Sequence, residues 1–266
     1  MTPAETGGNW AERAYEAMAP VYDVFTAHHD YKAWLADLLK LLERNGLQGR
    51  RLLDVGCGTG KSFLPLLPAG WDVTGCDVSP AMVELAREKA GDSVNLAVAD
   101  MRELPKLGEF DLIWALDDAV NYLLSREELG QALVGMRENL APTGLLLFDL
   151  NTLLAYRTFF AETEVLERSG WRLVWTGMAT ADVAPGSICE STLESFPLEA
   201  TGDSPKAPAL RHRQRHFPEA EVLATLERAG LECLDVYGHG LDGIPRQPLD
   251  ESIHTKAVYV ARIAGA

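Results

Sequence analysis

The segment Leu52–Gly60 constrains the fold of this chain more than any other stretch. An apolar run ends in Asp54-Val55, and three glycines then alternate with small residues. This pattern predicts a buried parallel strand that runs into a tight turn and then a helix. Glycines adopt positive φ angles and let a ligand come close to bare backbone amides. Neither common nucleotide motif is met, because Lys61 stands where the third glycine of the nicotinamide fingerprint would fall and no Walker Gly-Lys-Ser/Thr follows.

Strand and helix patterns alternate after this turn, which is typical of βαβ units. The sequence predicts further strands of the same sheet at residues 71–77, 94–98, 110–116, 145–150, 231–237 and 253–261. Alternating segments between residues 163 and 217 predict an antiparallel layer that interrupts this pattern. We therefore expect an α/β fold, a doubly wound and mostly parallel seven-stranded sheet with a small inserted antiparallel layer.

Four of the predicted parallel strands end in acidic residues, at the edge where open α/β sheets bind ligands. They are Asp54, Asp77, Asp100 and the pair Asp117-Asp118. One such residue alone is as readily a helix N-cap, but four in register with the glycine turn favour a ligand site. From its position Asp77 can accept two ribose hydroxyls, and Asp100 can hold an adenine amino group.

The pattern acid-x-Gly-x-Gly-x-Gly, together with these strand-end acids, resembles the class I S-adenosylmethionine-dependent methyltransferases over about residues 50–150 and the closing strands. The resemblance implies a Rossmann-like methyltransferase fold, with S-adenosylmethionine as cofactor and S-adenosylhomocysteine as its product. It also implies the cofactor-binding residues Tyr22, Asp54, Gly56, Cys57, Gly58, Gly60, Asp77, Val78, Met82, Asp100, Met101, Leu116 and Asp117. Lys61 departs from the family pattern, and we expect its charge to point to solvent.

The predicted elements divide the chain into three regions. Residues 1–45 form an N-terminal helical lid, in which Pro20 separates two helices. The cofactor-binding core is discontinuous in sequence and comprises residues 46–162 and 218–266. The antiparallel layer at residues 163–217 is inserted into this core on the substrate side.

The methyl acceptor would contact segments outside the glycine turn, since that turn serves only the cofactor. Tyr15 and Tyr22 in the lid are candidate catalytic residues, because their hydroxyls can orient a nucleophile or the methyl group. The alternative is that their rings only hold the lid helices to the sheet. Beyond the fourth strand, Asp118, Asn121 and Tyr122 are candidate substrate contacts.

The segment 211–216 alternates Arg with His and Gln. A strand there places its arginines on one face and its two histidines and Gln214 on the other. His216 is a further candidate catalytic residue, as a general base, and Arg215 is a candidate anchor for an acceptor carboxylate. Charges that keep an edge strand from aggregating are the alternative explanation.

The lid, the insert and the helix after His216 resemble, more weakly, bacterial small-molecule methyltransferases of the glycine and amino-sugar N-methyltransferase type. This second resemblance implies N-methylation of a small molecule in bacterial secondary metabolism, such as antibiotic biosynthesis. Three alternatives stay open. The first is small-molecule O-methylation, and the second is methylation of a protein. The third is a non-catalytic protein that binds S-adenosylmethionine or S-adenosylhomocysteine.

The formal net charge of −15 argues against a nucleic-acid partner, because a phosphate backbone needs clustered Lys and Arg. No apolar stretch approaches about 18 residues and the N-terminus lacks a secretory pattern, so we expect no membrane contact and a cytoplasmic location. The four cysteines include no C-x-x-C pair, which fits a reduced compartment. The histidines lack metal-ligand spacing, so no catalytic metal is expected. The insert either forms a homodimer interface or roofs the pocket.

Overall fold

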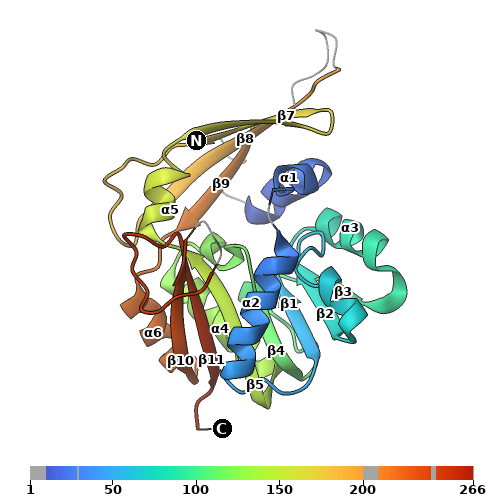
Figure 1. Ribbon diagram of the computed structural model, residues 1–266, viewed down its shortest axis with the longest axis vertical. Coiled ribbons are helices and arrows are strands. Elements are labelled where there is room, and N and C mark those ends of the chain that lie inside the picture. The colour runs from blue at the N-terminus through green and yellow to red at the C-terminus, as the bar shows by residue number, and fades with distance from the viewer. Residues whose placement is uncertain (1–9, 29, 200–208, 241–243, 266) are drawn as a thin grey trace.

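The computed structural model describes residues 10–28, 30–199, 209–240 and 244–265, which form two separate sheets (Figure 1). The larger sheet has seven strands in the order β10-β11-β5-β4-β1-β2-β3, and the smaller has four in the order β6-β7-β8-β9. The larger sheet contains β1 (Arg51–Val55), β2 (Asp72–Asp77), β3 (Asn95–Val98), β4 (Phe110–Ala115), β5 (Leu140–Asn151), β10 (Leu231–His239) and β11 (Lys256–Ile263). The smaller sheet contains β6 (Thr163–Arg168), β7 (Trp171–Gly177), β8 (Ile188–Pro197) and β9 (Leu210–Arg215).

The larger sheet is wound outward from its centre in both directions. β1 pairs in parallel with β2 on one side and with β4 on the other, while β11 lies antiparallel between β5 and β10. Chain order therefore reverses between β1 and β4, which is where doubly wound sheets open a crevice at the carboxyl ends of their strands. The predicted mixed sheet with a separate antiparallel layer is confirmed.

Helices cover both faces of the larger sheet (Figure 1). One face packs against Leu35, Leu38 and Leu42 of α2, and the opposite face packs against α4 and α6. Among the described residues, no helix combines the length and apolarity needed to cross a bilayer. The helices are α1 (Trp10–Phe25), α2 (Tyr31–Arg44), α3 (Pro80–Ala90), α4 (Arg126–Asn139), α5 (Leu153–Thr158) and α6 (Glu219–Arg228), with short 3₁₀ helices η2 (Leu64–Ala69), η3 (Gly91–Ser93), η4 (Met101–Glu103) and η5 (Ala119–Tyr122).

Helix α1 lies between the smaller sheet and the edge of the larger one (Figure 1). Its Met18 and Val21 form a buried apolar cluster with Met82 of α3 and with Leu173 and Leu193 of the smaller sheet. This cluster is the hydrophobic contact between α1, α3 and the smaller sheet. It explains why the inward face of the smaller sheet carries apolar residues.

Polar contacts also fasten α1 to the core. Glu16 Oε2 accepts hydrogen bonds from Ser79 Oγ at 2.8 Å and from the amide of Ala81 at 3.0 Å, at the N-terminus of α3. Asp23 accepts a hydrogen bond of 2.7 Å from the hydroxyl of Thr59, inside the glycine turn. A carboxylate at a helix N-terminus is favourably placed in the helix dipole. Helix α1 is therefore held against the glycine turn and the start of α3.

The structure differs from three local expectations. Pro20 lies inside α1, which continues to Phe25, so this proline does not separate two helices. The turns after the glycine loop are 3₁₀ and not α-helical, because the prolines inside η2 remove backbone donors. Strand β6 was not expected, since all its residues except Leu166 are exposed and it therefore lacks hydrophobic alternation.

Lys61 does not point to solvent as the sequence suggested. Its Nζ donates a hydrogen bond of 2.6 Å to Thr26 Oγ1, and it lies 5.5 Å from the ring centroid of Tyr31. Burial lowers the pKa of Lys61, while Asp23 nearby raises it in part. The side chain links the end of the lid helix to α2.

Candidate functional site

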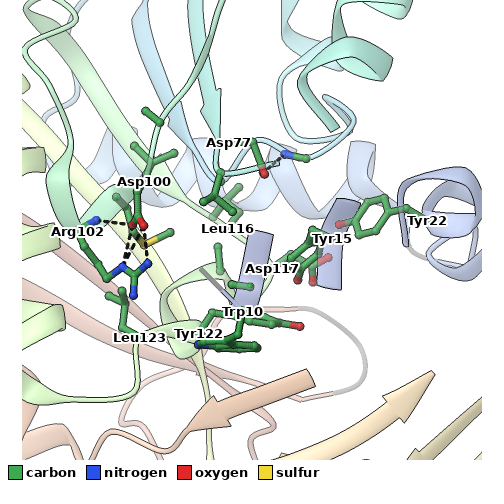
Figure 2. Close-up of a pocket in the computed structure, with 18 residues that line it drawn as sticks. Trp10, Tyr15, Tyr22, Asp77, Asp100, Arg102, Leu116, Asp117, Tyr122 and Leu123 are labelled. Carbon is green, nitrogen blue, oxygen red and sulfur yellow. Dashed lines mark hydrogen bonds and ion pairs between the residues drawn. The ribbon is translucent and has the colours of Figure 1, made fainter. Parts of the chain in front are cut away.

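A pocket opens at the carboxyl ends of β1, β2 and β4, under helix α1 (Figure 2). The space between its walls, its open mouth included, is about 730 Å³. In the view of Figure 2, Asp77 and the stacked rings of Trp10 and Tyr122 lie on opposite sides. The lining residues are Trp10, Ala11, Tyr15, Tyr22, Val55, Gly56, Gly58, Asp77, Val78, Ala99, Asp100, Met101, Arg102, Leu116, Asp117, Ala119, Tyr122 and Leu123.

The glycine turn curls over the end of β1. Gly56 has a φ of 74° and Gly58 a φ of 52°, both in the left-handed region that favours glycine. A Cβ on Gly56 would stand 2.9 Å from the Cβ of Ala119, so a larger residue would crowd the turn. The amide of Gly58 donates to Asp77 Oδ2 at 2.8 Å, which joins the turn to the end of β2.

Asp77 lines the pocket and has unused positions for accepting hydrogen bonds. Its Oδ1 accepts from the amide of Ser79 at 2.9 Å, and its Oδ2 accepts from Gly58. A carboxylate has about four acceptor positions, so two remain for ligand hydroxyls. Burial raises the pKa of Asp77, and these backbone hydrogen bonds lower it in part. The residue fits the ribose contact expected from its place at the end of the strand.

Asp54 lies beneath the glycine turn and does not line the pocket. It is buried, accepts a hydrogen bond from Ser62 Oγ, and lies beside Trp114 in the register of β1 and β4. Burial raises its pKa to about 7. Asp54 therefore supports the turn from below and is not placed to contact a ligand directly.

Three other predicted cofactor contacts are also absent from the pocket wall. Cys57 is buried behind the turn against Gly75, and Met82 is buried under the lid helix. Gly60, with a φ of 87°, abuts the ring of Phe63. These residues shape the turn and its support, whereas the other nine predicted cofactor contacts line the pocket.

The carboxylate of Asp100 is engaged by Arg102, which the sequence analysis did not consider. Arg102 donates from Nε and Nη2 to both carboxylate oxygens at 2.5–3.1 Å, and its amide donates to Oδ1 at 3.0 Å. Arg102 also reaches Glu128 at 3.2 Å. An adenine amino group would compete with Arg102 for these oxygens. The neighbouring Met101 side chain still lines the pocket as expected.

The loop after β4 is a strained turn held by a buried carboxylate. Asp117 and Asp118 have φ values of 59° and 53°, which is unfavourable for residues other than glycine. Their amides donate to Oδ1 and Oδ2 of the fully buried Asp149 at 2.6 and 3.0 Å. Asp149 lies on β5 and stabilises this turn from the core side. No local sequence pattern around Asp149 indicates this role.

Lys256 of β11 joins this cluster of carboxylates. Its Nζ donates to Asp118 at 2.6 Å and to Asp149 at 2.8 Å, and lies 3.7 Å from Asp117. Burial lowers the pKa of Lys256, but the three carboxylates raise it further, so it stays charged. Burial raises the pKa of Asp118 to about 6 despite Lys256. With its carboxylates ionised, the cluster has two more negative charges than positive ones.

Aromatic side chains form the lid side of the pocket. The rings of Trp10 and Tyr122 stack at 5.6 Å, and Tyr15 lies 5.1 Å from Tyr122 between ring centroids. Tyr31, which does not line the pocket, donates a hydrogen bond of 2.6 Å to Asp117 Oδ2. Burial raises the pKa of these tyrosines, and of Tyr22, above the usual range. Their hydroxyls are therefore neutral near pH 7 and do not act as phenolate bases.

Two of the expected substrate contacts point away from the pocket. Asp118 bonds to Lys256 and to Gln214 Nε2 of β9. Asn121 is buried, donates to the carbonyl of Arg215 at 2.8 Å and accepts from the amide of Asn151 at 2.9 Å. These residues connect the carboxyl end of the larger sheet to β9 of the smaller sheet, whereas Tyr122 lines the pocket.

Arg215 and His216, two further candidate site residues, contact groups outside the pocket. Arg215 pairs with Glu221 at 2.6 Å and lies over the ring of Phe217. His216 Nε2 lies 2.9 Å from Glu251. Neither residue lines the pocket. The predicted alternation itself is confirmed, since the inward face of β9 buries its histidine and glutamine while its arginines are half-buried or exposed.

The fold and the pocket together define a class of protein. A doubly wound seven-stranded sheet with a glycine turn after β1 and acidic residues at the ends of β2 and β4 is a methyltransferase fold. A family model described as "Methyltransferase domain" matches residues 52–144. This part of the chain is therefore a methyltransferase domain, a kind of domain that uses S-adenosylmethionine as its cofactor. Among the described residues, no group of three His, Cys, Asp or Glu side chains is arranged to hold a metal ion.

Known proteins resemble this chain in sequence and in structure. A putative methyltransferase of Geobacillus sp. strain WCH70 is 37% identical over 142 residues, 52% of this chain and 58% of that protein. The dTDP-3-amino-3,4,6-trideoxy-alpha-D-glucopyranose N,N-dimethyltransferase of Streptomyces venezuelae is 32% identical over 49% of this chain and 56% of its own length. The match therefore spans less than two thirds of either relative.

A solved structure covers most of the chain. The sugar N-methyltransferase KedS8 from Streptoalloteichus sp. superposes with a TM-score of 0.68 at 25% sequence identity. The alignment covers 91% of this chain and 93% of that protein. The likeness therefore extends beyond the glycine turn to most of the described architecture.

Proposed function

We propose that this protein transfers a methyl group from S-adenosylmethionine to a nitrogen atom of a small molecule of the amino-sugar class. The observation that carries the proposal is the chemistry of the pocket wall. The wall combines the carboxylate of Asp117 with neutral tyrosine hydroxyls. None of the residues that line the pocket is a histidine, lysine or cysteine. The relatives that act on amino sugars support the same assignment.

The residues of the pocket fit S-adenosylmethionine. The bound cofactor supplies an electrophilic methyl group on a positively charged sulfur. Gly56 and Gly58 let its amino acid part approach the backbone, because neither carries a Cβ. Asp77 has acceptor positions left for ribose hydroxyls, and Met101 offers an apolar surface to the adenine ring. Asp117, backed by the buried cluster of Lys256 and Asp149, favours a cation at the opposite end.

Nitrogen is preferred over oxygen as the acceptor atom for a physical reason. An uncharged amine already carries a free lone pair, so orientation alone supplies much of the rate. An alcohol needs a base within hydrogen-bond reach to remove its proton. The buried tyrosines of this pocket have raised pKa values and are poor bases near pH 7. The carboxylates of its wall already accept hydrogen bonds from other groups, Asp77 from two amides, Asp100 from Arg102 and Asp117 from Tyr31. Negative charge around Asp117 also favours an acceptor that becomes cationic.

The experiment measures binding first and turnover second. Calorimetry with S-adenosylmethionine and S-adenosylhomocysteine tests the pocket, and absence of binding by both would overturn the proposal. The enzyme is then incubated with nucleotide-linked amino sugars and with matched sugars that carry a hydroxyl in place of the amine. N-methylated product, identified by mass spectrometry, is expected only from the amines. Product from the hydroxyl series would support O-methylation, and binding without any product would support a non-catalytic binding protein.

A further inference from the structure

His212 stands behind the pocket wall, in contact with Tyr122. It lies on the inward face of β9 and is 1% exposed. Its Nδ1 is 2.9 Å from the hydroxyl of Tyr122, which lines the pocket. Its ring centroid lies 6.0 Å from that of Tyr15 and 5.5 Å from that of Trp175. Aromatic packing therefore fixes the imidazole in one orientation, with Nδ1 against the Tyr122 hydroxyl.

The imidazole of His212 is uncharged under ordinary conditions. Burial lowers its pKa to about 4, so near pH 7 it has one N–H group and one bare nitrogen. In the described structure its Nε2 makes no hydrogen bond, and neither does Ser191 Oγ, its partner in the β8–β9 register. The Tyr122 hydroxyl is thus the one polar contact that the structure gives this ring.

The direction of the hydrogen bond between Tyr122 and His212 follows from the chemistry of its two groups. A phenol hydroxyl is a stronger hydrogen-bond donor than the N–H group of an uncharged imidazole, and a bare imidazole nitrogen is a better acceptor than a phenol oxygen. The Tyr122 hydroxyl therefore donates to Nδ1 of His212. The proton of His212 is then on Nε2.

We propose that His212 is a positioning residue that draws the hydroxyl proton of Tyr122 away from the pocket. The pocket then meets oxygen lone pairs on this wall, and an acceptor N–H group can donate to them. This inference rests on the proposed N-methylation. A tyrosine proton directed at the acceptor would bind the amine lone pair that must attack the methyl group. By holding that proton, His212 leaves the lone pair free and favours acceptors that carry N–H groups.

The first test is a double-mutant cycle on turnover with an amine acceptor. His212→Leu and Tyr122→Phe should each lower kcat by about tenfold, the order expected for one lost hydrogen bond, while the Kd for S-adenosylmethionine stays within about twofold. The double variant should be no slower than the slower single variant, because His212 acts only through the Tyr122 hydroxyl. His212→Asn should regain most of kcat, since its amide oxygen can stand where Nδ1 stood.

The control is Arg213→Gln, on the outward face of the same strand, where Arg213 pairs with Glu190 at 3.0 Å. It should leave kcat and KM unchanged. Wild-type kcat in His212→Leu, or losses that add in the double variant, would overturn the inference. If wild-type enzyme binds S-adenosylmethionine but methylates no amine, the proposed function fails, which is a separate result.

The second test needs no acceptor. A ¹⁵N spectrum of the histidine rings, assigned by the signal lost in His212→Asn, reports which nitrogen of His212 carries the proton. A protonated Nε2 and a bare, hydrogen-bonded Nδ1 are expected, with the Nδ1 shift moved by Tyr122→Phe. A protonated Nδ1 would overturn the inference even in an active enzyme.

Discussion

The Nζ atom of Lys256 lies 2.8 Å from Oδ2 of the fully buried Asp149, which also receives the amides of Asp117 and Asp118. One residue pair on neighbouring strands β5 and β11 thus holds the strained turn that borders the pocket. The carboxylate satisfies two backbone donors in an unfavourable conformation, and the ammonium compensates its charge. Strain of this kind persists only where the surroundings over-determine it.

Lys256→Met should destabilise the protein by about 3 kcal/mol, because it leaves buried carboxylates without their cation. Urea denaturation measures the free energy of unfolding. The double variant Asp118→Asn/Lys256→Met should recover part of the loss, since asparagine removes one charge and tolerates the positive φ of position 118. Lys40→Met is the matched control, because Lys40 forms an exposed pair with Asp37 at 2.8 Å. Equal losses at positions 256 and 40 would contradict the role of the cluster.

Asp77→Ala should weaken the binding of S-adenosylmethionine by roughly 1–3 kcal/mol, as charged hydrogen bonds to a ribose are lost. Isothermal titration calorimetry gives the affinity, and a melting curve verifies that the variant is folded. Asp72→Asn, at the exposed start of the same strand, is the control and should bind normally. If folded Asp77→Ala binds S-adenosylmethionine as tightly as wild type, another residue binds the ribose.

Gly56→Ala should lower both stability and cofactor affinity. The substitution forces alanine to a φ of 74° and brings its Cβ within 2.9 Å of Ala119, at a cost of about 1–3 kcal/mol. Gly170→Ala separates strain from crowding, because Gly170 has a similar φ of 79° with nothing within 4 Å of the added Cβ. Chemical denaturation of both variants should show the larger loss at position 56, and only that variant should bind the cofactor more weakly.

Asp54 makes stability depend on pH in a defined direction. Its pKa of about 7 in the folded chain lies above the ordinary value of an unfolded aspartate, near 4. Between these values the folded chain holds a proton that the unfolded chain has released. The contribution of Asp54 to the free energy of unfolding therefore falls as pH rises, by at most about 1.4 kcal/mol per pH unit.

Asp54→Asn removes this titration. Denaturation of wild type and variant at about pH 5 and pH 7 should show the variant gaining stability relative to wild type as pH rises. A constant difference between the two proteins across this range would mean that Asp54 is ionised throughout. Ser62→Ala removes the hydroxyl that donates to Asp54 and so raises the pKa of this carboxyl further. The free energy of unfolding of this variant should therefore depend more strongly on pH than that of wild type.

The cofactor half of the site was largely predictable from sequence because its signals are local. Gly56 and Gly58 are required where the backbone takes positive φ, and Asp77 occupies the last position of its strand. Asp54, at the end of β1, shows the limit of such reasoning. A strand-end carboxylate can face the ligand or the core, and only the packing of Ser62 and Trp114 around Asp54 decided for the core.

The acceptor half was predicted less well because its contacts join distant segments. His212, and not His216, reaches the pocket wall, although both histidines lie on one face of the β9 segment. The difference depends on where β9 crosses Tyr122, and a pattern of alternation carries no information about that crossing. Arg215 pairs with Glu221 of α6, a contact that a pattern of alternation does not predict either.

By itself the sequence determined the α/β architecture, the glycine turn and the acidic strand ends, because hydrophobic periodicity and backbone conformation act over a few neighbouring residues. Only the tertiary structure decided the partners of the acids: Lys256 for Asp118 and Asp149, Arg102 for Asp100, and Tyr31 for Asp117. Most of these contacts join residues on separate elements that the fold brings together. The charge and the hydrogen-bond direction at the pocket are therefore properties of the assembled sheets, and not of any single motif.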